Sequence, residues 1–323
     1  MTSSPVLFDK RLLVVAGKGG VGRTTVAAAL AAAAARHGKR VLLCQTKSKE
    51  RLSTLFGVPE VGTDIVRLRE RLYAVNMTPR AALREYGAMV LRSEFVAKQV
   101  LENKVSRTFL KAVPGLEDYA MLGKVWFHAV DDLENGRPKW DLVIMDGPAT
   151  GHLLTMLGIP QAILAAVPEG PLTRPAQSSL ALLRDPQRSA MVLVTLAEDM
   201  PANEVVELSR RQLREVGMPL GPLVVNQLYS PRFSTGSSAR ALEALGPTPS
   251  EDTLRPLLDA ANASRRRREI NDRYLAWLSH ELPLPQLHLP FLFSATFGPE
   301  ALDTLSRALD QQLGGGLASA AAL

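Results

Sequence analysis

A glycine-rich loop follows the first apolar run of the chain and opens directly into an alanine-rich stretch. It reads Gly17-Lys18-Gly19-Gly20-Val21-Gly22-Arg23-Thr24-Thr25. The glycines let backbone N–H groups turn inward and cradle phosphate oxygens, and the helix that follows adds the positive end of its dipole. The hydroxyl of Thr24 is placed to bind Mg²⁺. A glycine turn without a ligand is the alternative, but four glycines in six residues before a tandem threonine favour a nucleotide phosphate site.

A carboxylate closes a second apolar run, because Asp146 follows four apolar residues at 142–145. Nucleotide-hydrolysing proteins hold Mg²⁺ at such a strand end, so Asp146 joins Thr24 as a predicted metal-binding residue. The chain continues as Gly147-Pro148-Ala149-Thr150-Gly151-His152. A lone histidine beside a glycine turn is more often structural than catalytic, and we expect His152 to hold this turn. The remaining histidines show no metal-ligand spacing.

The elements that must position these residues alternate along the chain. Strands are predicted at 11–16, 41–45, 72–77, 140–145, 191–197, 220–228 and 286–289. Helices are predicted at 24–37, 202–216, 238–245, 250–280 and 299–313. This alternation predicts an α/β fold, a mainly parallel sheet flanked by helices. Two helical stretches, 79–135 and 153–186, interrupt it, so we predict one domain over 1–323 with an inserted helical subdomain, and a disordered tail at 314–323.

Composition places the chain among ordinary globular proteins, since 46% of its 323 residues are apolar and 22% are charged. A single cysteine, Cys44, excludes an intrachain disulfide, and we expect neither zinc nor an iron–sulfur cluster. Four arginines at 265–268 have no interleaved aromatic residues, so no nucleic-acid partner is expected. The start lacks the order of a signal peptide, and glycines and prolines break up the uncharged stretch 147–168. We therefore expect a cytoplasmic protein that is not integral to a membrane.

The segment from Asp146 to His152 has the pattern Asp-x-x-x-Thr-Gly-His, which is narrower than a glycine-rich loop. Here the chain resembles the ATPase family of the arsenical pump (ArsA) and of the tail-anchored-protein targeting factor, in the deviant P-loop class. Three further segments agree in order, and the resemblance covers residues 11 to about 305. They are Pro114-Gly115-Leu116-Glu117, Val224-Val225-Asn226-Gln227 and Leu289-Pro290-Phe291.

The resemblance implies a P-loop NTPase fold that binds ATP or ADP with Mg²⁺ through residues 17–25. It also implies that Asp146 opens switch II, the segment that senses the γ-phosphate. Asn226 would then recognise the adenine base, and Pro290 and Phe291 would pack on it.

Lys18 stands directly after the first glycine, which marks the deviant P-loop class. In that class this lysine reaches into the nucleotide site of a dimer partner. The resemblance therefore implies a dimer that closes on ATP, with Lys18 and Asp146 acting in catalysis.

Two residues depart from the family pattern. Arg23 stands where the family has the P-loop lysine, and by spacing from residues 52–57 Lys47 stands where it has the aspartate that activates water. A protonated lysine cannot accept a hydrogen bond from water, so it cannot orient the nucleophile. Glu50 is a possible substitute if the loop bends. We expect slow hydrolysis.

Three functions remain open at this point. The first is an ATP-binding dimeric switch, as a homodimer or as a heterodimer with a paralogue. The second is a pseudo-ATPase, a regulatory or interaction subunit that pairs with an active paralogue. The third is a partition or positioning ATPase. A protein client is also possible, because four methionines lie in or beside the insertions, although such residues often fill a core. They are Met77, Met89, Met121 and Met156.

Overall fold

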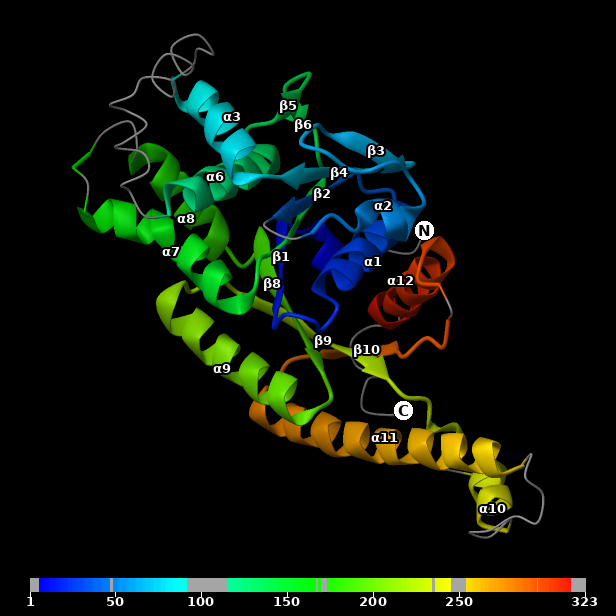
Figure 1. Cartoon of the computed structure of the whole chain (residues 1–323). Helices are drawn as coiled ribbons and strands as arrows, with labels where there is room; N and C mark the ends of the chain where they lie inside the picture. The colour runs from blue at the N-terminus through cyan, green and yellow to red at the C-terminus, as the bar shows by residue number, and fades with distance from the viewer. Residues whose placement is uncertain are drawn as a thin grey trace.

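A mixed eight-stranded sheet runs through the molecule in the order β10-β9-β8-β1-β7-β2-β4-β3 (Figure 1). Its strands are β1 (Leu12–Gly17), β2 (Val41–Thr46), β3 (Val66–Arg69), β4 (Leu72–Met77), β7 (Leu142–Asp146), β8 (Ser189–Leu196), β9 (Leu220–Leu228) and β10 (Gln286–Pro290). Every neighbouring pair is parallel except β3 and β4, which are antiparallel. The predicted mainly parallel sheet is therefore confirmed.

The computed structural model describes most of the chain. The described residues are 6–46, 49–91, 115–166, 168–169, 173–233, 236–244, 254–294 and 296–314. Within them the helices are α1 (Arg23–Arg36), α2 (Leu52–Phe56), α3 (Pro79–Leu91), α6 (Leu116–Val130), α7 (Thr150–Ala166), α8 (Thr173–Arg184), α9 (Asp199–Glu215), α10 (Gly236–Ala244), α11 (Leu254–Glu281) and α12 (Pro299–Gly314).

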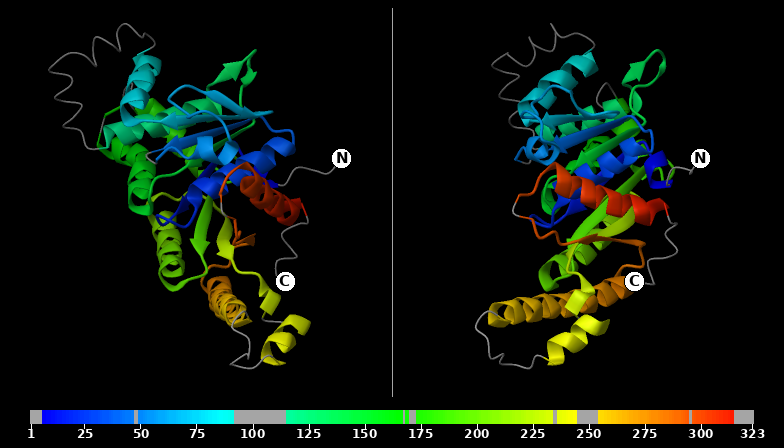
Figure 2. Two further views of the ribbon diagram at one scale, coloured as in Figure 1. Left: turned by 45° about the vertical axis from the view of Figure 1, so that its right-hand side comes forward. Right: turned by 90° about the vertical axis from the view of Figure 1, so that its right-hand side faces the viewer.

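Helices cover both faces of the sheet, as Figure 2 shows from the side. Successive strand residues point to opposite faces. Leu13 and Val15 of β1 therefore pack with α1, α2 and α12, whereas Leu12 and Val14 pack with α6, α7, α8 and α9. All residues of β1 are buried, because a parallel strand in the middle of such a sheet is covered on both sides.

The two stretches marked as insertions are helical where the structure describes them. They supply α3, α6, α7 and α8, which lie at the end of the molecule opposite α11 (Figure 1). A short hairpin, β5 (Leu133–Glu134) and β6 (Arg137–Pro138), follows α6 and was not expected. That the four helices form a subdomain of one domain stays a prediction, and residues 92–114 lie outside the described residues.

Several element bounds differ from the predicted ones. Helix α7 begins at Thr150 rather than 153, and α9 begins at Asp199 rather than 202. Helix α12 includes Gly314, so the predicted tail starts one residue too early, and residues 315–323 lie outside the described residues. Strand β3 was missed because it is a short edge strand that contains two arginines. Among the described helices, none is both long and apolar enough to cross a membrane.

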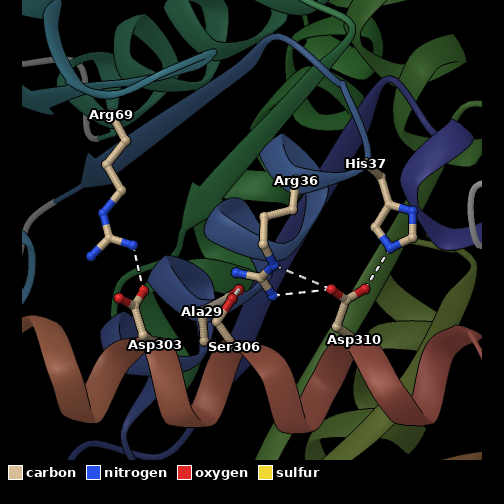
Figure 3. A network of polar contacts seen from close by, with 7 residues as sticks. All are labelled: Ala29, Arg36, His37, Arg69, Asp303, Ser306 and Asp310. Carbon is tan, nitrogen blue, oxygen red and sulfur yellow. Dashed lines mark hydrogen bonds and ion pairs between the residues drawn. The ribbon is translucent and has the colours of Figure 1, made fainter.

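Helix α12 packs along α1, and polar contacts flank this packing (Figure 3). Asp310 accepts hydrogen bonds from Nε and Nη2 of Arg36 at 3.2 and 3.1 Å and also pairs with His37. Asp303 pairs with Arg69, and the hydroxyl of Ser306 donates to the carbonyl of Ala29 at 2.8 Å. The C-terminal helix is thus held by charges at its margins and by apolar side chains between them.

Asp310→Asn is expected to lower the free energy of unfolding by about 1 kcal/mol, because it weakens the partly exposed ion pair with Arg36 and the hydrogen bond with His37. Leu309 is fully buried in the same interface, and Leu309→Ala should cost about 2–5 kcal/mol. Urea unfolding at low salt and in 1 M NaCl separates the two causes. Salt should shrink the Asp310 effect and leave the Leu309 effect, whereas equal salt dependence would contradict this account.

Candidate functional site

The glycine-rich loop joins the end of β1 to the start of α1 and has little room for side chains. A Cβ atom on Gly17 would lie 2.3 Å from the carbonyl oxygen of Val194. Gly22 has φ +90°, and a Cβ atom there would lie 2.4 Å from Nδ2 of Asn226. No side chain caps α1, whose first turn contains no acidic residue. The unpaired N–H groups of the helix therefore remain available to an anion at this end.

Thr24 and Asp146, the two predicted metal-binding residues, are in direct contact. The hydroxyl of Thr24 donates to Oδ2 of Asp146 at 2.7 Å. The contact arises because β1 and β7 pair in parallel with Val15 opposite Asp146, so both strands end at the loop. A hydroxyl and a carboxylate are hard oxygen donors, and Mg²⁺ is held by one or two carboxylates together with substrate phosphates and waters. The pair fits Mg²⁺. The described residues contain no cluster of three or more His, Cys, Asp or Glu side chains that could hold another metal.

Asp146 is 1% exposed, and burial raises its pKa to about 6. The hydrogen bond from Thr24 and the positive charge of Arg23 oppose this shift. The hydroxyl of Thr46 donates to the backbone carbonyl of Asp146 at 2.8 Å. The carboxylate is therefore fixed in position but remains costly to ionise without a cation beside it.

Arg23 turns toward the segment after β7. Its Nη1 donates to the carbonyl of Gly147, and burial lowers the pKa of the guanidinium while the charge of Asp146 opposes that shift. Arg23 thus ties the loop to the start of the predicted switch II.

Lys18 lies against α9 of its own chain. Its Nζ is 2.5 Å from Oε1 of Glu204 and 2.6 Å from the sulfur of Met200. The side chain is 30% exposed. Within one chain, Lys18 therefore links the loop to α9.

Asn226, the predicted base-recognising residue, is 4% exposed and contacts the loop. Its Nδ2 donates to the carbonyl of Val21 at 2.9 Å, and its Oδ1 accepts from the backbone N–H of Gln227 at 2.9 Å. Gln227 adopts the left-handed region with φ +58°, which is uncommon for a residue other than glycine. Asn226 thus has a positioning role at the loop that sequence reasoning did not find.

A cavity of about 560 Å³ opens beside the loop. Its walls include Gly20, Gly22 and Thr25 together with residues 49–51, 226–227 and 290–292. The structure therefore places the predicted Asn226, Pro290 and Phe291 in one cavity with the phosphate loop. The ring of Phe291 is stacked on Tyr229, with centroids 4.9 Å apart. Sequence reasoning missed Phe297 and Leu305, which also line the cavity.

The residues predicted around the site are placed unequally. Lys47 lies outside the described residues. Glu50 lines the cavity, but its Oε1 and Oε2 accept hydrogen bonds from the backbone N–H and the hydroxyl of Ser53 at 2.8 and 2.6 Å. The expected turn at 150–152 is wrong, because these residues form the first turn of α7, where His152 is exposed.

The methionines proposed for a client groove are largely internal. Met77, Met121 and Met156 are each at most 2% exposed and belong to the hydrophobic core. The side chain of Met89 lies outside the described residues. The core-filling alternative therefore accounts for the three described side chains.

Known proteins resemble this chain, and the match to a family model lies in its first half. The sequence model of the anion-transporting ATPase family, ArsA_ATPase, matches residues 10–169. The chain is 28% identical over 242 residues to the ATPase BagA of Mycobacterium tuberculosis, which covers 73% of this chain and 71% of that protein. It is 24% identical over 269 residues to the ATPase GET3 of Kluyveromyces lactis, covering 72% and 76%. The arsenical pump-driving ATPase of Acidiphilium multivorum is 26% identical over 230 residues, which is 66% of this chain but 39% of that protein.

Asp146→Asn is expected to stabilise the nucleotide-free protein at pH 8 by roughly 1–3 kcal/mol, because it removes a buried charge. The raised pKa of about 6 lies above the ordinary value of 3.8, so the folded protein binds more protons between these values. The penalty of the carboxylate therefore grows as pH rises toward 6 and is constant above it. Urea unfolding in EDTA should show the gain falling to about half at pH 5. A gain equal at both pH values, or a loss at pH 8, would contradict this.

Proposed function

Because this chain belongs to the ArsA-type ATPase family, we propose that it binds Mg-ATP at residues 17–25 and works as a dimeric switch with slow hydrolysis. The 2.7 Å contact between the hydroxyl of Thr24 and the carboxylate of Asp146 carries this proposal. It joins the loop to the strand end from which the predicted switch II begins. The cavity beside the loop supplies space for the nucleoside.

Each part of the site has a role in this proposal. Backbone N–H groups of the loop and the start of α1 bind the phosphates, and the residues around Asn226 and Pro290 hold the base. Thr24 and Asp146 would hold Mg²⁺, which supplies positive charge to the phosphates when bound. Asp146 also connects this charge to switch II through its own strand. Occupancy of the γ-phosphate position can thereby alter residues 147–152.

Slow hydrolysis is proposed because no described residue of the cavity is a free carboxylate that could orient water. Glu50 is the acidic residue of the cavity wall, and each of its oxygens already accepts a hydrogen bond from Ser53, which orients the carboxylate toward α2. Lys47 cannot accept a hydrogen bond while it is protonated. Arg23 already uses Nη1 for the carbonyl of Gly147, so part of its guanidinium is committed to the protein.

Calorimetry of the purified full chain with Mg-ATP and Mg-ADP tests the binding half of the proposal. Saturable binding with one nucleotide per chain is the expected result. The absence of binding to both nucleotides at high protein concentration would overturn it. Light scattering with and without ATP tests the dimer, which should form or tighten with ATP.

The double reversion Arg23→Lys with Lys47→Asp is expected to raise kcat for ATP by at least about 10-fold. Losing a residue that orients water or stabilises transition-state charge typically costs orders of magnitude in rate. Steady-state phosphate release measures the change, and adding Asp146→Asn to the double variant should abolish the gain. A fast wild-type rate that the reversion does not change would refute slow hydrolysis.

The position of Lys18 favours a second candidate, a pseudo-ATPase subunit that pairs with a catalytically complete paralogue. Arg23 donates to the carbonyl of Gly147, whereas Lys18 is 30% exposed and paired with Glu204, a contact that it would exchange for a partner's nucleotide. The chain thus keeps the lysine that acts on a partner's nucleotide while both residues that act on its own are changed. A third candidate, DNA partition, requires a steep fall of DNA affinity with salt.

Mixing this chain with such a paralogue should stimulate ATP hydrolysis if the second candidate holds. Lys18→Ala should remove the stimulation while size-exclusion chromatography still shows assembly. Lys39→Ala is the matched control, because Lys39 pairs with Asp9 beyond the far end of α1 and its loss should leave stimulation intact. Stimulation insensitive to Lys18, or no association, would reject this candidate.

A further inference from the structure

Residues 49–51 line the cavity beside the loop, and two of the three are cationic. Lys49 and Arg51 line the same cavity as Gly20, Gly22 and Thr25. The loop and the start of α1 contribute partial positive charge from their N–H groups. Two full positive charges therefore share the cavity with an anion-binding backbone.

The backbone that carries these two side chains is held in place. The buried side chain of Gln45 donates from Nε2 to the carbonyl of Lys49 at 3.0 Å. Arg51 precedes α2, and its carbonyl accepts from the N–H of Leu55 at 3.1 Å. The backbone at Lys49 and Arg51 is thus held by hydrogen bonds, and only the side chains need to move toward a ligand.

The two cations are not neutralised within the described part of the chain. Both side chains are exposed, and neither has a hydrogen-bond or ion-pair partner there. Glu50 lies between them in sequence, but its carboxylate is turned to the start of α2 and accepts two hydrogen bonds from Ser53. Glu50 therefore lines the same cavity without forming an ion pair with either base.

We propose that Lys49 and Arg51 form a second phosphate-binding element, so that the cavity selects nucleotides by the number of their phosphate charges. This rests on the proposed nucleotide site. The ammonium of Lys49 acts as a mobile point charge, and the guanidinium of Arg51 offers a planar fork that matches two phosphate oxygens. Where a carboxylate at this segment would prepare water for attack, these cations hold the unreacted polyphosphate.

Competition against a fluorescent ATP analogue measures the effect on the full chain. The titrations use ATP, ADP and AMP in EDTA, so that the phosphates carry their full charge. The double variant Lys49→Gln with Arg51→Gln should weaken ATP binding by about 10- to 100-fold, ADP binding less, and AMP binding by less than about 3-fold. The slope of log Kd against log salt should also become shallower.

Two further variants interpret the result. Arg80→Gln removes one charge from an exposed residue of α3 and should leave all three affinities within about 2-fold, as a surface change does. Arg51→Lys keeps the charge and should recover part of the loss in the Arg51→Gln single variant. Equal losses for ATP, ADP and AMP, or no loss, would overturn this inference alone. Wild-type protein that binds ATP neither in EDTA nor with Mg²⁺ added would overturn the proposed nucleotide site itself.

Discussion

The parallel pairing of β1 with β7 is the constraint on which the rest of the site depends. It sets Val15 opposite Asp146, so that a loop and a carboxylate more than 120 residues apart meet at one edge of the sheet. Burial makes that carboxylate expensive to ionise, and the surrounding groups offset only part of the cost. A cation bound beside Asp146 therefore interacts strongly with the carboxylate, because folding has already removed that group from water. The fold prepares a place for positive charge before any ligand arrives.

The loop is held from several strands at once. The carbonyl of Val194 in β8 leaves no room for a side chain at Gly17, and the side chain of Asn226 in β9 leaves none at Gly22. Asn226 also donates a hydrogen bond to the carbonyl of Val21, and Arg23 donates one to the carbonyl of Gly147 after β7. A shift of any one of these strands would change the positions of the loop N–H groups. The conformation of the phosphate loop is therefore a property of the whole sheet. Its glycines permit that conformation, and the neighbouring strands select it.

The sequence could predict much of this fold because the periodicity of apolar residues follows burial. Strands β1, β2 and β7 each begin with at least four apolar residues, and these strands lie in the middle of the sheet. The contact of Thr24 with Asp146 follows from two strand ends, which sequence can locate. The start of α7 could not be located in the same way, because Gly151 suggested a turn. Buried Leu153, Leu154 and Leu157 override that local preference by packing one face of a helix. The bond of Asn226 to Val21 and the turning of Glu50 toward Ser53 depend on distances and directions that no spacing encodes.

The late position of α12 in the chain sets the order in which the cavity is assembled during synthesis. Leu305, on this helix, is the last cavity-lining residue in chain order, and the glycine loop is the first. When the loop, the sheet and residues 226–227 and 290–292 have left the ribosome, the part of the cavity wall that α12 contributes has not yet been synthesised. The nascent polypeptide therefore presents an open pocket until α12 emerges and docks on α1. The complete cavity therefore exists only in chains whose α12 has emerged and docked, and anything that binds in it stabilises those chains alone.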